Sequence, residues 1–359
     1  MNIGIASPSM GEAEKRAVLA VMDSGHLVQG KVTEAFEQEF AGYHGAKHGI
    51  AVNNGTTALI AALMAHEIGP GDEVIIPSFS FFATASAVLF VGATPVFADI
   101  DPQTFCLSPE AAEAAITPRT AVIMPVHLFG LPADMPRFTQ LAEQYGILLL
   151  EDAAQAHGAA IDGRHTGTWG TASFSFYPSK NMTTGEGGML LTNDEQIATK
   201  LRVIRNQGMS KQYRHELVGF NFRLTDLASA IGRVQLQQLP EWTRQRQSNA
   251  RELSSRLTSV VTPCEPAGYE HVYHQYTVRA PANRDRDDAV RRLNERGIGA
   301  RVYYPTAIHQ QPIMQELGYG NADLPETARA TQTVFSLPVH PHLSQDERDY
   351  IVGEVNALW

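Results

Sequence analysis

Short apolar runs alternate with amphipathic stretches along the first two thirds of the chain. The apolar runs lie at 49–53, 73–77, 94–100, 121–127, 147–152, 172–177 and 187–192, and helical patterns lie between the earlier ones at about 56–68, 80–91, 108–116 and 134–145. Strands buried on both faces are continuously apolar, as residues 147–150 are. This alternation predicts an α/β fold with a mostly parallel, seven-stranded sheet covered by helices.

The last third of the chain has a different pattern. Residues 225 to about 257 are helical in pattern, and Pro240 is expected to kink or split that helix. After about residue 258 we expect strands near 271–280, 299–304 and 334–339, each followed by a helix. The chain is therefore expected to divide into a large domain, 1–240, and a smaller C-terminal α+β domain, 241–359, that includes the linking helix.

Two helix ends carry recognisable signals. The last helix is expected to begin at Ser344, because Glu347 is placed three residues later for a capping box. An N-terminal helix at about 11–23 is expected to end near Gly25.

The composition narrows the class of protein. The chain has 359 residues, 43% hydrophobic and 18% charged, with a formal net charge of −10, which argues against nucleic acid as a partner. Its two cysteines are too few for a disulfide framework or a zinc cluster. No signal peptide or membrane-spanning run is visible, so we expect no membrane association and a cytoplasmic protein.

Polar residues follow several of the predicted strands. Asn53, Asp152 and Tyr177 fall at carboxyl ends of strands, where open parallel sheets bind their ligands. After Asn53, Gly55 and Thr56 open an apparent helix, whose free amides attract phosphate. Taken alone, these residues favour simple N-capping by Asn54 or Thr56.

Lys180 is the residue with the most chemical meaning. It lies in Ser-Phe-Ser-Phe-Tyr-Pro-Ser-Lys, just before Gly-Glu-Gly-Gly. A lysine for a Schiff base, the Asp152 carboxylate for a ring nitrogen and a phosphate-binding helix start are the parts that hold pyridoxal phosphate (PLP). Gln155, one turn after Asp152, is placed to contact the ring, and the alternative is a solvated side chain. Ser175 is placed to bind phosphate, and the alternative is an ordinary strand hydroxyl.

Other side chains near the strand ends fit either a structural or a functional role. Phe81 offers a stacking face for a planar cofactor, although aromatic residues near strand ends often belong to the core. The thirteen histidines show no metal-binding spacing, and we expect His127 to be structural and no metal to be bound.

Taken together, these blocks resemble the DegT/StrS family of PLP-dependent sugar aminotransferases along nearly the whole chain. The matching stretches are 53–59, 69–78, 95–101, 125–130, 151–158, 174–188 and 219–224. The resemblance implies fold type I and a homodimer.

Carried over residue by residue, the resemblance assigns a role to each cofactor contact. Lys180 is the Schiff-base lysine and Asp152 the partner of the ring nitrogen. The further cofactor contacts it implies are Gly55, Thr56, Phe81, Gln155, Ser175 and Asn221. It also implies that Asn221 reaches the phosphate in the other subunit's site.

The substrate side is less defined. Relatives commonly carry an aromatic residue after the Ser-Gly pair that ends the first helix, whereas this chain has His26. The stretch that contains Tyr304 and His309 resembles the family's substrate-side loop. We take His26, Tyr304 and His309 as candidate substrate contacts.

The resulting hypothesis is an aminotransferase that moves an amino group from glutamate or glutamine to a keto-sugar, nucleotide-linked. An aminotransferase for a keto-cyclitol or another small ketone remains open. A non-catalytic regulator is disfavoured, because the set of catalytic residues is complete. A PLP-dependent sugar dehydratase is disfavoured, because family dehydratases carry histidine where this chain has Lys180. A dinucleotide-binding dehydrogenase is disfavoured too, because no G-x-G-x-x-G follows the first strand.

Overall fold

The computed structural model describes residues 1–359 and is built around a seven-stranded sheet. Its strand order is β1-β9-β8-β5-β4-β2-β3, and only β9 runs antiparallel to its neighbours, so the prediction of a mostly parallel α/β sheet is confirmed. The strands are β1 (His48–Val52), β2 (Glu73–Pro77), β3 (Thr94–Ala98), β4 (Thr120–Ile123), β5 (Leu148–Asp152), β8 (Thr171–Ser175) and β9 (Gly188–Thr192).

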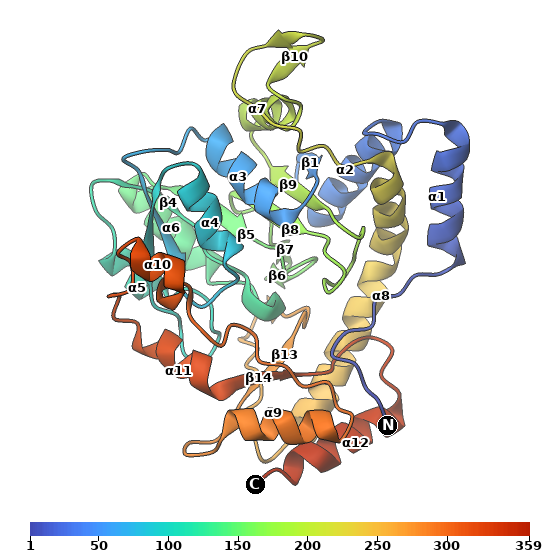
Figure 1. The fold of residues 1–359 in the computed structure, drawn as a ribbon, viewed down its shortest axis with the longest axis vertical. Coiled ribbons are helices and arrows are strands. Elements are labelled where there is room, and N and C mark those ends of the chain that lie inside the picture. The colour runs from blue at the N-terminus through green and yellow to red at the C-terminus, as the bar shows by residue number, and fades with distance from the viewer.

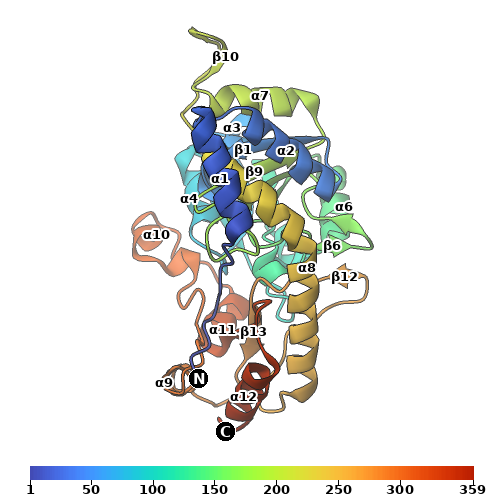
Figure 2. The ribbon, with the colours of Figure 1, turned by 90° about the vertical axis from the view of Figure 1, so that its right-hand side faces the viewer.

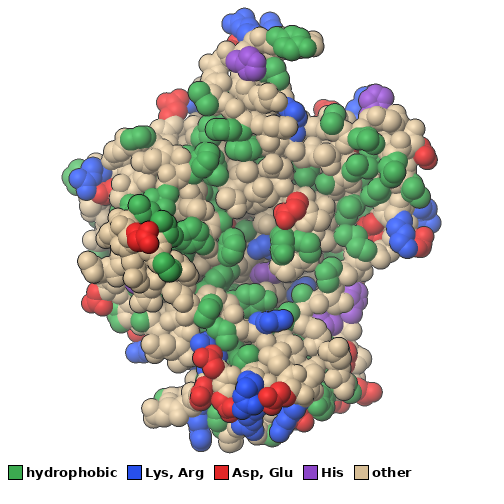
Figure 3. Space-filling view, in the orientation of Figure 1, with side chains coloured by type: hydrophobic (Ala, Val, Ile, Leu, Met, Phe, Trp, Pro, Cys, Tyr) green, Lys and Arg blue, Asp and Glu red, His purple; other side chains and the backbone are tan.

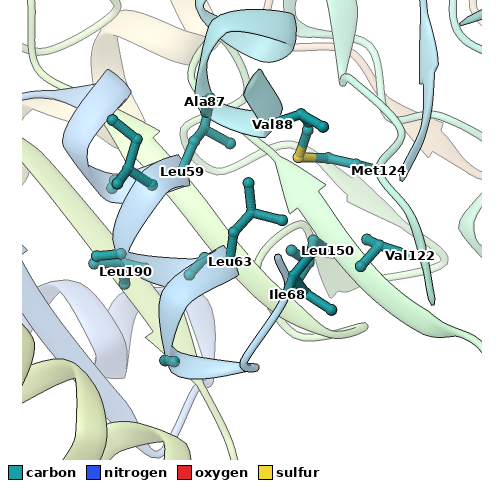
Figure 4. Close-up of a cluster of buried hydrophobic side chains, with 14 of the residues drawn as sticks. Leu59, Leu63, Ile68, Ala87, Val88, Val122, Met124, Leu150 and Leu190 are labelled. Atoms are coloured by element: carbon teal, nitrogen blue, oxygen red, sulfur yellow. The ribbon is translucent and has the colours of Figure 1, made fainter. Parts of the chain in front are cut away.

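Helices cover both faces of this sheet (Figure 1). They are α2 (Lys31–His44), α3 (Gly55–Ala65), α4 (Ala83–Phe90), α5 (Pro109–Ala114), α6 (Met135–Tyr145) and α7 (Glu195–Arg205), whereas α1 (Glu12–Ser24) packs against the long helix α8 (Asp226–Arg256). One hydrophobic core lies under α3, α4 and α7, where Leu59, Leu63 and Val88 meet Val122 and Leu150 of the sheet (Figure 4). A second core lies under α5 and α6, on the other face.

The linking helix α8 (Asp226–Arg256) runs from the sheet-containing body to the C-terminal part of the chain. Pro240 does not split it, because the helix continues on both sides of the proline. The helix instead changes direction along its length (Figure 2), as expected when one backbone hydrogen bond is missing. Ala250 and Leu253, in its later half, pack in a separate core with the C-terminal elements.

The C-terminal part contains β13 (Tyr276–Arg279), α9 (Arg286–Glu295), α10 (Pro312–Glu316), α11 (Pro325–Thr333), β14 (Val334–Leu337) and α12 (Gln345–Asn356). The predicted capping box at Ser344 and Glu347 is present at the start of α12. The N-terminus joins this part, because Ile3 pairs with Ile298. The division of the chain at residue 240 stays a prediction.

Two predicted strands of this part are wrong in extent. The stretch 299–304 forms only one isolated bridge, between Arg301 and Ser336, and turns away at Tyr304, whose φ is 57°. The stretch 271–280 becomes a strand only at Tyr276, after a positive φ at Tyr273. Positive φ values interrupt the extended backbone that a strand requires.

Short elements complete the fold. They are the strands β6 (Ala160–Ile161), β7 (Arg164–His165), β10 (Met209–Lys211), β11 (Arg214–His215) and β12 (Tyr269–Glu270), and the 3₁₀ turns η1 (Leu128–Gly130) and η2 (Ile308–Gln310). The β10–β11 hairpin projects from the body (Figures 1 and 2). No helix is both long enough and apolar enough to cross a membrane.

Candidate active site

A cavity of about 700 Å³ opens at the carboxyl ends of the central strands. The surface in Figure 3 is hollowed near the middle of this face, between the body and the C-terminal part. The cavity brings together eight of the candidate site residues: Gly55, Thr56, Phe81, Asp152, Gln155, Ser175, Lys180 and Tyr304. Residues that lie far apart in the chain thus form one site.

One wall of the cavity is the start of α3. Asn54 caps this helix by accepting the Thr57 amide at 2.9 Å, which leaves the amides of Gly55 and Thr56 without a partner. A Cβ on Gly55 would lie 2.7 Å from the Cβ of Ser175, so only glycine fits without a shift. N-capping and phosphate binding are therefore compatible here, because the cap uses the later amide and leaves the first two available for an anion.

Asp152 ends β5 at the base of the cavity and is 5% exposed. Thr84 Oγ1 donates to one carboxylate oxygen at 2.9 Å and the Ala154 amide to the other at 3.3 Å. Burial raises the pKa of Asp152, while these two donors and the nearby Lys180 amine act to lower it. The carboxylate is thus fixed in orientation, ready to accept one more charge-assisted hydrogen bond.

Lys180 follows β8 in a turn, where its amide donates to the Tyr177 carbonyl at 2.9 Å. The side chain is half-buried in the cavity wall. Loss of solvent lowers the pKa of its amine to about 8, and the Asp152 carboxylate opposes that shift. A substantial fraction of the amine is therefore neutral near pH 8, as nucleophilic attack on a carbonyl requires.

Gln155 is buried, whereas a solvated side chain was the alternative. Its oxygen accepts the Phe129 amide at 2.6 Å and its nitrogen donates to the Tyr304 hydroxyl at 2.8 Å. These two bonds fix the amide plane of Gln155 at the cavity wall and connect the sheet to the loop that carries Tyr304. Phe81 has an open face, because 62% of it is exposed, which fits a stacking surface better than a core position.

Three candidate residues do not line this cavity. His26 is exposed beyond the left-handed Gly25 cap of α1, with Nδ1 2.9 Å from the Ser24 carbonyl oxygen. His309 is buried, and its Nδ1 lies 2.7 Å from Ser78 Oγ. Asn221 is exposed, next to Phe222, whose carbonyl accepts the Asn53 amide. Their roles stay predictions.

Thr84 and His274 are among the residues that line the cavity and that the sequence reasoning missed. Thr84 donates a hydrogen bond to Asp152. Its place three residues after Phe81 was the only sequence signal that could have pointed to it. His274 is buried beside Lys180 and Asn181, and burial lowers its pKa well below the usual value. No motif pointed to His274, because it reaches the site from the stretch before β13.

His127 and Glu151 support the site from behind. His127 Nε2 lies 3.1 Å from a Glu151 oxygen, and the ring's Nδ1 accepts the Ala133 amide. Glu151 also accepts the amides of Gly167, Trp169 and Gly170, so each of its oxygens has partners. His127 thus has structural partners, and no group of histidine, cysteine and carboxylate side chains is arranged to hold a metal.

Comparisons with known proteins identify the family to which the chain belongs. A sequence model of the DegT/DnrJ/EryC1/StrS aminotransferase family matches residues 8–356. The chain belongs to this family. It is a PLP-dependent aminotransferase of fold type I, as the resemblance in the sequence implied.

Two relatives and one solved structure illustrate the similarity. The pleiotropic regulatory protein of Geobacillus stearothermophilus is 43% identical over 96% of this chain and 94% of its own. UDP-N-acetyl-3-dehydro-α-D-glucosamine 3-aminotransferase of Acidithiobacillus ferrooxidans is 42% identical over 91% of this chain and 88% of its own. Spr1654 of Streptococcus pneumoniae, solved in its PMP form, superposes with a TM-score of 0.94 at 27% identity, over 100% of this chain and 98% of its own.

The residues present fit the cofactor. The two free amides and the close approach at Gly55 form a cradle for a phosphate, and Phe81 offers an open face to a planar ring. Asp152 is an acceptor for a ring N–H, and Lys180 is an amine with a lowered pKa in the same cavity. This donor set matches the charge distribution of PLP, which has an anionic phosphate at one end and a protonated nitrogen at the other.

Proposed function

We propose that this aminotransferase moves an amino group from glutamate or glutamine to a keto-sugar that is linked to a nucleotide. The observation that carries the proposal is the shared cavity, in which Lys180, Asp152 and the Gly55–Thr56 turn all lie. Its volume of about 700 Å³ leaves room for a substrate larger than an amino acid. The name of the Acidithiobacillus relative, a UDP-sugar aminotransferase, supports this choice of substrate class.

The chain's own residues then have defined tasks. Bound PLP supplies an electron sink for the carbon that carries the amino group. Asp152, oriented by Thr84 and Ala154, would hold the ring nitrogen in its protonated form. Lys180 would anchor the cofactor and then carry a proton between donor carbon and cofactor, which its lowered pKa permits near neutral pH.

The remaining contacts position the cofactor. Gly55 and Thr56 would bind the phosphate through their free amides, and Ser175 would add a hydroxyl from the end of β8. Phe81 would stack on the ring, and Gln155, three residues after the end of β5, would contact it. Tyr304 lines the cavity from the C-terminal part and is the best placed of the three substrate candidates.

We also propose a homodimer in which Asn221 reaches the other subunit's site. Two facts support it: Asn221 is exposed without lining its own cavity, and exposed apolar side chains precede it. These side chains include Val218, 76% exposed, and Phe220, 36% exposed. Such a patch is typical of an interface between copies. Cytoplasmic localisation and the domain boundary at residue 240 also remain predictions.

The alternatives differ in substrate or in chemistry. A keto-cyclitol or another small ketone would use the same cofactor residues and differ only in the acceptor. A non-catalytic regulator has support in the printed name of the Geobacillus relative. The complete set of cofactor residues in this chain favours catalysis.

Borohydride reduction followed by peptide mapping tests the proposal. We expect a yellow protein in which reduction links pyridoxyl to Lys180, and we expect glutamate or glutamine to bleach the visible absorbance of the bound cofactor. Keto-sugars linked to nucleotides should restore that absorbance, whereas free keto-cyclitols should not. Label on another lysine would contradict the assignment of Lys180, and a holoenzyme that no amino acid bleaches would favour the regulator.

A further inference from the structure

Arg246 of α8 is a buried cation without an anionic partner. The residue is 7% exposed and forms no ion pair. Nη1 donates to the Tyr273 carbonyl at 3.1 Å, and Nε has no hydrogen-bond partner. Burial lowers the pKa of this arginine to about 10. Removing a guanidinium from water without a counter-charge is costly, so a fold that keeps one in this way has a use for an anion there.

A small recess lies between Arg246 and Lys180. It has a volume of about 20 Å³ and shares Ser179 and Lys180 with the main cavity. Its other lining residues include Ser7, Ser9, Gln235 and Trp242, and none of the lining residues is acidic. Because one water needs roughly 10–15 Å³ by this measure, the recess holds one or two oxygen-sized groups. A carboxylate fits, and a sugar or nucleotide does not.

The position beside Lys180 decides which carboxylate this is. In an α-amino acid the amine and the α-carboxylate are attached to the same carbon, so a donor whose amine faces Lys180 places its α-carboxylate close by. A guanidinium binds a carboxylate through two parallel N–H donors, and serine and tryptophan side chains at the recess can add further donors. An amino sugar carries no such group.

We propose that Arg246 binds the α-carboxylate of the amino donor and thereby restricts the donor to α-amino acids. This inference rests on the proposed aminotransferase function and adds the residue that recognises the donor. The keto-sugar does not contact Arg246 in this arrangement, so the donor and the acceptor are recognised by different groups within one cavity.

The test compares glutamate with 4-aminobutyrate, which is glutamate without its α-carboxylate, in single-turnover bleaching of the holoenzyme. Arg246→Gln should slow the glutamate reaction by roughly 10–150-fold in kcat/KM and leave any slow reaction with 4-aminobutyrate unchanged. Calorimetric binding of 2-oxoglutarate to the holoenzyme should weaken by a similar factor. Arg244→Gln is the matched control, because Arg244 lies on the same helix, is exposed and pairs with Glu241; it should behave like the wild type.

The outcomes distinguish a failure of the proposed aminotransferase function from a failure of the role of Arg246. If no α-amino acid bleaches the wild type, the proposed function fails, whatever Arg246 does. Two results with a wild type that is bleached would overturn the role of Arg246. Arg246→Gln could react with glutamate and bind 2-oxoglutarate as well as the wild type does, or its reactions with glutamate and 4-aminobutyrate could slow by the same factor. If Arg246→Gln does not fold, Arg246→Lys is the deciding variant, because lysine keeps the positive charge but lacks the two parallel N–H donors. Its reaction with glutamate should slow more than its reaction with 4-aminobutyrate. Wild-type selectivity between the two amines in Arg246→Lys would overturn the inference.

Discussion

Gly55 offers a sharp test of the phosphate-binding wall. A methyl group at this position would lie 2.7 Å from Ser175 Cβ and 3.2 Å from its Oγ. Both contacts are shorter than ordinary van der Waals contact, and Ser175 is fixed by β8, so the turn that carries the free amides must move. Forcing extra volume into a packed site typically costs about 1–3 kcal/mol.

We therefore expect Gly55→Ala to weaken PLP binding by roughly 5–150-fold. Gly55 is the first residue of α3, where alanine is intrinsically the better helix former by up to about 1 kcal/mol. The two effects have opposite signs, and the steric one is expected to win because its range lies above the propensity gain.

The assay is equilibrium binding of PLP to the apoenzyme, followed by its absorbance, together with thermal unfolding of the apoenzyme and holoenzyme. Gly42→Ala is the control, because Gly42 lies in α2 and a Cβ there meets nothing within 4 Å. It should leave PLP affinity unchanged and raise the free energy of unfolding by about 0.5–1 kcal/mol. Wild-type PLP affinity in Gly55→Ala would refute the idea that this wall is a tight cradle.

The other predictions concern the cofactor and substrate residues. Asp152→Asn should retain PLP but lose transamination by more than the roughly 10–150-fold that one charge-assisted hydrogen bond is worth; near wild-type turnover would exclude the ring-nitrogen role. PLP uptake by the apoenzyme should speed up as the pH rises through about 8, where Lys180 loses its proton, and not near 10.5. Mixing inactive Lys180→Ala and Asn221→Ala subunits should restore activity if Asn221 acts across a dimer; no recovery after verified exchange would place Asn221 outside the partner's site. His26→Trp should change kcat/KM for the keto-acceptor and leave the donor half-reaction unchanged; equal effects on both would indicate only a helix-end role.

The large sheet could be predicted from the sequence because its strands are buried on both faces. Short, continuous apolar runs such as β2 and β5 are typical of strands in a sheet covered by helices, and all seven predicted strands form. The helix α2 was overlooked even though Phe36, Phe40 and Ala41 recur at helical spacing and are buried. The sequence did indicate where this helix begins and ends, since Gly30 and Gly45 flank the apolar pattern.

The C-terminal part was harder to predict because isolated residues with positive φ interrupt its strands. A propensity argument expects Tyr273 and Tyr304 to extend a strand, whereas both adopt positive φ, and Tyr304 contributes to the cavity. Contacts across the fold decide such positions: Gln155 holds the Tyr304 hydroxyl from a stretch 149 residues earlier. Arg246 was missed for the same reason, since nothing in its local sequence says that it is buried.

Burial shifts the pKa values of Lys180 and Asp152 in opposite directions. Loss of water disfavours charge, so it raises the pKa of Asp152 and lowers that of Lys180 to about 8. Thr84 and Ala154 then donate to the carboxylate and favour its ionised form, while no hydrogen bond to the amine opposes its deprotonation. The outcome is a carboxylate that can accept a ring N–H and an amine that can be neutral, within one cavity. For Lys180, burial shifts the amine toward the neutral form that attack on a carbonyl requires. For Asp152, burial opposes the ionised form that a ring N–H requires, and the hydrogen bonds from Thr84 and Ala154 offset that effect.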